Sequence, residues 1–159
     1  MSNSSDANTY SPLAPAKAIS KILIVDDSKT DTYVARKVAE ELFDEVRSVS
    51  NVDEMFKELQ TFRPDILTMD IHLSDRLNGI SLVAEIRALD NDLSVMPIVV
   101  ISSRQMPSDK QIASNAGASD YIIKPVTVEA LERTARRLIP GFVPKPKPFG
   151  DMVTIGDTK

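Results

Sequence analysis

The sequence has 159 residues, of which 42% are hydrophobic, and its formal net charge at pH 7 is −4. This length supports one domain with a substantial core, and the acidic balance argues against direct nucleic-acid binding, which needs a basic face. The lack of cysteine excludes disulfides, thiolate zinc sites and thiol nucleophiles, and no apolar run is long enough for a membrane helix or a signal peptide, so we expect a cytoplasmic protein without membrane insertion.

The two ends of the chain differ in composition from its middle. Residues 1–20 are rich in Ser, Asn, Ala and Pro without an apolar period, which is typical of a flexible arm. Residues 140–159 begin with Pro-Gly and have four prolines in their first nine positions, which predicts an extended tail or linker. The predicted domain therefore spans residues 21–139.

Five short runs of apolar and β-branched residues predict strands. They are KILIVD (21–26), EVRSVS (45–50), DILTMD (65–70), PIVVISS (97–103) and DYIIKP (120–125). Each run is followed by a segment with helical signals. These signals are the apolar period of Val34, Val38 and Leu42; a capping box at Asn51 and Glu54; the segment 79–89; a capping box at Ser108 and Gln111 for a short helix that Gly117 closes; and the stripe of Val128, Leu131, Ala135 and Leu138.

Five βα units with nearly continuous apolar strands predict an α/β fold, with helices on both faces of a parallel sheet. In such folds ligands bind outside the carboxyl ends of the strands. Those ends carry Asp26 and Asp27 after the first strand, Asp70 after the third, Ser102 after the fourth and Lys124 after the fifth. We therefore expect three carboxylates, one hydroxyl and one ammonium in a single pocket.

The chemistry of this set favours phosphoryl transfer. Three carboxylates in one crevice repel one another, and Mg²⁺, for which Mn²⁺ could substitute, would compensate them. Asp70 can then act as a nucleophile towards phosphorus, while Ser102 and Lys124 bind the phosphoryl oxygens. Taken singly, each residue has an ordinary alternative: a helix N-cap for Asp26 or Asp27, a polar strand end for Ser102, and a solvated charge for Lys124. The joint pattern favours the functional interpretation.

From residue 21 to residue 139 the sequence resembles the receiver domain of two-component response regulators. The resemblance rests on the motifs VDDS, LTMDIHL, PIVVISS and GASDYIIKP and on the terminal amphipathic helix, in the order and spacing of that family. It implies a flavodoxin-like, doubly wound (βα)5 fold with a five-stranded parallel sheet in the order 2-1-3-4-5.

The resemblance also implies roles in phosphoryl transfer. Asp70 would be the phosphoacceptor, supplied by the phosphohistidine of a histidine kinase, and Ser102 and Lys124 would bind the transferred group. Tyr121 would turn inward when Ser102 moves towards that group. The Lys124–Pro125 bond is expected to be cis.

A second set of roles concerns the metal and the lifetime of the phosphorylated state. Asp27, Asp70 and the backbone carbonyl of His72 would be the Mg²⁺ ligands, with Asp26 acting through a water. By the same resemblance, His72 and Arg104 would occupy the two positions that tune how long the phosphoryl group survives attack by water.

One loop departs from the pattern of many receivers, which have a proline four residues and a glycine eight residues after the phosphoacceptor. Here Ser74 takes the proline position, and Gly79 comes nine residues after Asp70. The longer loop, with Asp75 and Arg76, is expected to lie over the metal site.

As a receiver, the protein would act in bacterial phosphorelay signalling and would not be an enzyme beyond its self-catalysed phosphorylation and dephosphorylation. Its partners would be a sensor histidine kinase or a histidine phosphotransfer protein, and a downstream protein target. That target would dock on the face formed by the helix 108–115, the fifth strand and the last helix. The first of these helices is expected to shift most easily, because Ile112 is its only large apolar anchor. A homodimer is a further alternative, in which the terminal arms would mediate the pairing.

Four other interpretations compete with this one. A haloacid-dehalogenase-type phosphatase uses similar groups, but in that class the nucleophile comes early and the acid pair last. A degenerate receiver that serves as a scaffold would lack site residues that are present here. The chain could be the receiver fragment of a longer regulator with its output domain removed. A phosphohistidine carrier would expose its ring on a helical bundle, whereas His72 is expected in a loop next to Asp70.

Overall fold

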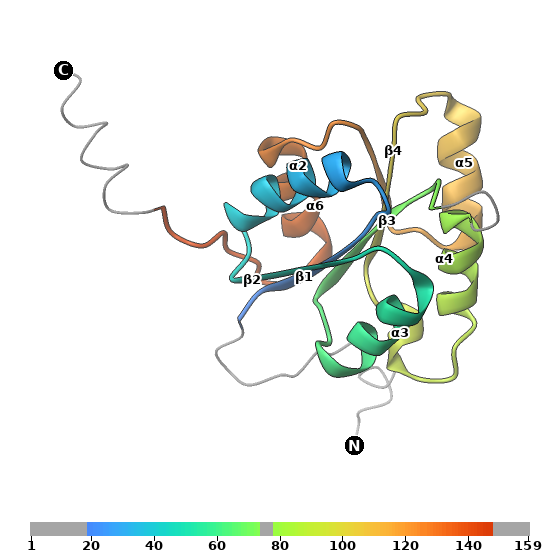
Figure 1. Cartoon of the computed structure of the whole chain (residues 1–159), viewed down its shortest axis with the longest axis horizontal. Coiled ribbons are helices and arrows are strands. Elements are labelled where there is room, and N and C mark those ends of the chain that lie inside the picture. The colour runs from blue at the N-terminus through green and yellow to red at the C-terminus, as the bar shows by residue number, and fades with distance from the viewer. Residues whose placement is uncertain (1–18, 74–77, 148–159) are drawn as a thin grey trace.

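The computed structural model describes residues 19–73 and 78–147, and its elements are labelled as in Figure 1. The strands are β1 (Lys21–Val25), β2 (Glu45–Val49), β3 (Ile66–Asp70), β4 (Ile98–Ser102) and β5 (Asp120–Ile123). The helices are α2 (Lys29–Glu40), α3 (Val52–Thr61), α4 (Gly79–Arg87), α5 (Pro107–Ala116) and α6 (Val128–Leu138), with a 3-10 helix, η1 (Asp92–Val95), before β4. Every predicted strand and helix is present, whereas η1 is an addition to the prediction.

The strands form one parallel sheet in the order β2-β1-β3-β4-β5, which confirms the flavodoxin-like fold. Val25 pairs with Met69, and Asp70 pairs with Ile101, so the carboxyl ends of β1, β3 and β4 lie side by side. β3 and β4 are buried along their whole length. In this order the chain moves towards one edge of the sheet from β1 and towards the opposite edge from β3. Such sheets have a crevice at the point between these two strands.

Two hydrophobic cores lie on opposite faces of the sheet. In Figure 1, α2 and α6 cover one face, and α3, α4 and α5 cover the other. Because side chains alternate along a strand, Ile22 and Ile24 pack with α2 and α6, while Leu23 and Val25 pack on the opposite side. Burial on both faces explains the continuous apolar runs in the sequence. Within the described ranges, no helix combines the length and the apolar character needed to cross a membrane.

The ends of two helices test the predicted caps. Asn51 caps α3 as expected, since its Oδ1 accepts a hydrogen bond of 2.9 Å from the Glu54 N–H. The predicted cap at Ser108 is wrong, because α5 begins at Pro107, one residue earlier. The Asp109 carboxylate accepts instead from the N–H of Met106, at 3.1 Å. Proline suits the first helical position since the missing N–H would have no intrahelical partner there.

The packing of α5 also differs from the prediction. Ile112, the expected anchor, is 53% exposed, and the buried residue of this helix is its neighbour Ala113. The carboxyl end of α5 is held by a charged side chain: Nε of Arg87, at the end of α4, donates to the Gly117 carbonyl at 2.8 Å. Gly117 itself adopts a left-handed conformation with φ of 112°, as predicted for a helix stop. The buried Ala113 side chain and the hydrogen bond from Arg87 therefore hold α5 in place.

The folded part of the chain extends beyond the predicted boundary at residue 139. Phe142 is 7% exposed and packs against Phe43, with 5.1 Å between the ring centroids. Three residues later, the Lys145 N–H donates to the Leu42 carbonyl at 3.0 Å. The first residues of the proline-rich segment are therefore attached to the end of α2. The remainder, 148–159, and residues 1–18 of the predicted arm, 1–20, lie outside the described residues.

Phe142→Ala should lower the free energy of unfolding by about 3 kcal/mol, because it removes a buried ring and leaves a cavity beside Phe43. Urea unfolding would measure this change. The matched control is Val143→Ala, since the Val143 side chain is 72% exposed and its loss should have almost no effect. Equal stability of the two variants would contradict the assignment of Phe142 to the core.

Candidate functional site

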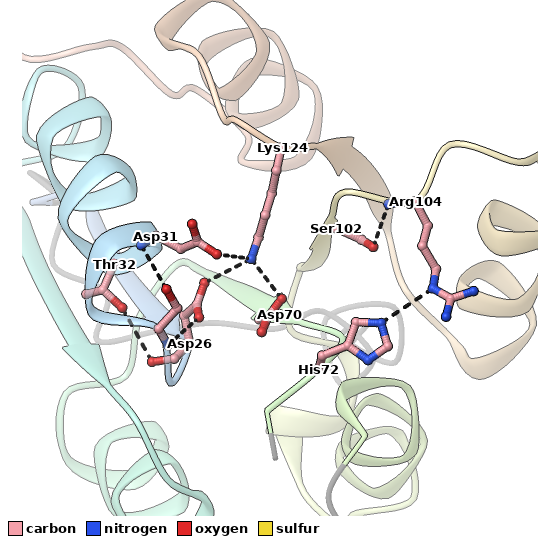
Figure 2. Close-up of polar contacts among 9 residues, drawn as sticks. Asp26, Asp31, Thr32, Asp70, His72, Ser102, Arg104 and Lys124 are labelled. Carbon is pink, nitrogen blue, oxygen red and sulfur yellow. Dashed lines mark hydrogen bonds and ion pairs between the residues drawn. The ribbon is translucent and has the colours of Figure 1, made fainter. Parts of the chain in front are cut away.

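The candidate site lies at the carboxyl edge of the sheet, where β1, β3, β4 and β5 end (Figure 2). Asp26 and Asp27 follow β1, and Asp70 is the last residue of β3. Asp26 and Asp70 are buried, Asp27 is exposed, and one carboxylate oxygen from each lies within 4.8 Å of the others. The structure thus brings together all three acids that the sequence placed at strand ends.

Backbone hydrogen bonds fix the turn that carries Asp26. Its N–H donates to the Val49 carbonyl at 3.2 Å, and its Oδ1 accepts from the Ser28 N–H at 2.9 Å. The N-cap of α2 is Ser28, whose hydroxyl accepts from the Asp31 N–H at 3.1 Å. The alternative role of Asp26 or Asp27 as a helix N-cap is therefore wrong, and both carboxylates are available to the site.

Lys124 reaches into this acidic cluster from the end of β5. Figure 2 shows its ammonium between three carboxylates: Nζ lies 2.6 Å from Oδ2 of Asp31, 3.0 Å from Oδ1 of Asp70 and 3.4 Å from Oδ2 of Asp26. The Lys124 N–H also donates to the Ser102 carbonyl at 2.8 Å, and its bond to Pro125 is cis. Lys124 is thus a counter-ion of the acidic cluster, which excludes its alternative as a solvated charge.

The pKa values in the cluster reflect burial and these charges. Burial raises the pKa of the Asp26 carboxyl; the Ser28 N–H opposes this shift, and the negative charge of Asp70 adds to it. For Lys124, burial alone would lower the pKa, but the hydrogen bonds that its ammonium donates to Asp31 and Asp70 and the charge of Asp26 raise it well above the ordinary value. The ammonium therefore stays charged at neutral pH, although the acids are only partly compensated.

Ser102 and Tyr121 both contact the segment that follows β4. Ser102 is buried, and its Oγ accepts a hydrogen bond of 3.1 Å from the Arg104 N–H. The Tyr121 hydroxyl donates to the Arg104 carbonyl at 2.9 Å, and the residue is partly exposed. Movement of Ser102 would therefore disturb the same loop residue that holds Tyr121. The inward turn of Tyr121 when Ser102 moves remains a prediction.

His72 lies two residues after Asp70, at the start of the β3–α4 connection, and not on a helix (Figure 2). Its exposed ring accepts a long hydrogen bond of 3.4 Å at Nε2 from Nε of Arg104. The two residues expected to tune the phosphoryl lifetime are thus in contact at the mouth of the site. The role of the His72 carbonyl as a metal ligand remains a prediction. The expected cover from Ser74, Asp75 and Arg76 falls outside the described residues.

Gly79 approaches the end of β3 closely, which the sequence pattern did not indicate. Its N–H donates to the Ile71 carbonyl at 2.6 Å. A Cβ atom at this position would lie 2.1 Å from the backbone carbonyl oxygen of Asp70, so any larger residue would push the β3–α4 connection away from the sheet. Gly79 therefore allows α4 to start directly behind the end of β3.

Asp31 is the second residue of the site that sequence reasoning missed. In the sequence it is an acid in the first turn of a helix, where the helix dipole commonly favours a carboxylate. In the structure it borders a cavity of about 350 Å³ together with Asp26, Asp70, Lys124 and Pro125. Its role depends on the contact with Lys124, which lies 93 residues later in the chain. No local sequence pattern indicates such a contact.

The donor set suits a hard divalent cation. Three convergent carboxylates offer only oxygen atoms, two of the residues are buried, and Lys124 compensates them in part. Mg²⁺ binds such sites through one or two carboxylates and completes its shell with waters and phosphate oxygens. The exposed side of Asp27 leaves room for these further ligands.

Comparison with known proteins agrees with the fold. The sequence profile described as "Response regulator receiver domain" matches residues 22–136. Protein PilH of Pseudomonas aeruginosa is 29% identical over 123 residues, which cover 77% of this chain and 100% of PilH. The transcriptional regulatory protein KdpE of Staphylococcus aureus is 32% identical over 117 residues, which cover 74% of this chain but 48% of KdpE. The chain thus spans about half the length of this regulator.

Solved structures show the same arrangement. The chemotaxis protein CheY4 of Vibrio cholerae matches with a TM-score of 0.66 and 25% identity, over 77% of this chain and 100% of that protein. The bacteriophytochrome response regulator RtBRR matches with a TM-score of 0.68 and 25% identity, over 87% of this chain and 90% of that protein.

Proposed function

Since this chain belongs to the response regulator receiver family, we propose that it accepts a phosphoryl group on Asp70 and uses the modified state to control a protein partner. The observation that carries this proposal is the position of the Asp70 carboxylate. It is buried at the end of the central strand, 3.0 Å from the Lys124 ammonium and within 4.8 Å of Asp26 and Asp27. Burying several charges together costs free energy, and such clusters occur more often at functional sites than in purely structural roles.

In the proposed reaction, an Asp70 carboxylate oxygen attacks the phosphorus of a phosphohistidine on a sensor kinase or a histidine phosphotransfer protein. The new O–P bond gives an acyl phosphate, and the broken P–N bond returns its electron pair to the donor imidazole. Lys124 stabilises the charge on the phosphoryl oxygens, and Ser102 donates its hydroxyl to one of them. A bound Mg²⁺ would neutralise the acids and the incoming oxygens. Attack of water on phosphorus then releases inorganic phosphate and restores Asp70, so no other substrate is turned over.

The output surface that we propose comprises α5, β5 and α6. Met106 and Ile112 are 64% and 53% exposed at the start and in the middle of α5, and exposed apolar side chains are common at protein contacts. Because the core contacts of α5 are limited to the buried Ala113 and the partly buried Ala116, a change in the Ser102 and Tyr121 contacts would move it at low cost. A downstream protein, or a second copy of the chain, would bind the moved surface. Histidine kinase signalling of this kind would place the protein in the cytoplasm.

Acetyl phosphate with Mg²⁺ provides the test, because it supplies the phosphoryl group without a kinase. Mass spectrometry should find one added phosphoryl group, mapped to Asp70, and the adduct should not form when EDTA removes the metal. Asp70→Asn should carry no adduct. Asp90→Asn is the matched control, since this exposed residue follows α4, and it should behave as the wild type. A wild-type protein that stays unmodified, or is modified elsewhere, would overturn the proposal.

A further inference from the structure

All three N–H donors of the Lys124 ammonium face carboxylates in this state, so none is left for a phosphoryl oxygen. An ammonium has three N–H donors, and Lys124 directs them at three carboxylates. The contact with Asp31 is the shortest of the three, at 2.6 Å, against 3.0 Å for Asp70 and 3.4 Å for Asp26. A phosphoryl group that binds Lys124 must therefore displace one of these partners.

Asp31 is the partner most easily released. Its side chain is 42% exposed, so water can solvate the freed carboxylate, whereas the Asp26 side chain is 6% exposed and is also bound by the Ser28 N–H. Asp70 carries the phosphoryl group itself and stays beside it. Within the described ranges, the Asp31 carboxylate has no partner other than Lys124.

We propose that Asp31 is a positioning residue that competes with the phosphoryl group for Lys124 and thereby lowers the stability of the phosphorylated state. This inference rests on the proposed function of Asp70. Asp31 belongs to α2, and Lys124 follows β5, so transfer of the ammonium to the phosphoryl group would also break a contact between these two elements at the rim of the cavity. The negative charge of Asp31 would in addition repel the phosphoryl oxygens across that cavity.

Binding of beryllofluoride, a non-transferable analogue of the phosphoryl group, tests the inference in the presence of Mg²⁺. Asp31→Asn keeps the size of the side chain but removes its charge, and calorimetry should show about three- to fivefold tighter binding than the wild type, the scale of a partly exposed ion pair. Asp31→Glu restores the charge and should bring the affinity back towards the wild-type value. Asp53→Asn removes an acid from the first turn of α3 and should leave the affinity unchanged.

A second measurement needs no substitution. In the wild type, the ¹³C signal of the Asp31 carboxylate should shift when beryllofluoride and Mg²⁺ bind, because it loses its contact with Lys124. Each outcome has a distinct meaning. Wild-type protein that fails to bind beryllofluoride would overturn the proposed function. Wild-type binding with equal or weaker binding by Asp31→Asn, with an equal gain in Asp53→Asn, or with an unmoved Asp31 signal would overturn the inference on Asp31 alone.

Discussion

Replacement of Lys124 with methionine should slow phosphoryl transfer from acetyl phosphate to Asp70 by about 100-fold or more, the usual cost of one lost charge-stabilising donor. The ammonium lies 3.0 Å from the Asp70 carboxylate, so it is placed to bind the oxygens that gain charge as the O–P bond forms. Methionine keeps most of the length and the apolar stem but cannot donate. The rate of adduct formation, followed by intact mass at saturating Mg²⁺, measures the effect.

The same substitution should also destabilise the folded protein at neutral pH. Because the pKa of Lys124 is raised in the fold, its ion pairs contribute fully below the ordinary lysine pKa and are lost only as the pH rises through the folded value. Methionine removes that contribution and leaves three carboxylates without their counter-ion. Lys57→Met, at an exposed position of α3, is the matched control. A Lys124→Met protein with the transfer rate of the control would contradict the role assigned to this ammonium.

Asp26→Asn should weaken Mg²⁺ binding about 10- to 100-fold, the usual cost of losing a group that supports a metal site. Calorimetric titration with Mg²⁺ would measure this loss.

The Asp26→Asn substitution should also make the metal-free protein more stable at neutral pH. Burial raises the pKa of Asp26 in the fold, and the charge of Asp70 adds to the shift, so the ionised carboxylate opposes folding. Asparagine removes this cost and can still accept the Ser28 hydrogen bond through its carbonyl oxygen.

The dependence on pH follows from the direction of this shift. A carboxyl group with a raised pKa favours folding while it is protonated, and that contribution is lost as the pH rises through the folded pKa. The difference in unfolding free energy between Asp26→Asn and the wild type should therefore be largest at neutral pH and should shrink in acid. Urea unfolding in EDTA at both pH values measures it, with Asp90→Asn as the control. A metal-free Asp26→Asn protein that is less stable than the wild type at pH 7 would show that Asp26 has a structural role.

The strands and helices were predictable because their signals are local. A strand buried on both faces has to be apolar along its length, as in the runs that became β1, β3 and β4. The order of the sheet was not in these patterns and came from the resemblance to receivers. The caps were predictable only in part: Asn51 follows the usual rule, whereas the start of α5 uses Pro107 and Asp109 in a way that the pair of Ser108 and Gln111 concealed.

The sequence by itself determined that acids, a hydroxyl and a lysine stand at the carboxyl ends of the strands, because parallel strands bring those ends to one edge wherever they lie in the chain. Only the tertiary structure decided which further groups meet them. The contact of Asp31 with Lys124 and the packing of Phe142 on Phe43 both join distant segments. The exposure of Ile112 depends on how a short helix is rotated against the sheet, and one large apolar residue cannot specify that rotation. Local patterns report burial and backbone geometry, whereas partners across the fold depend on how whole elements pack.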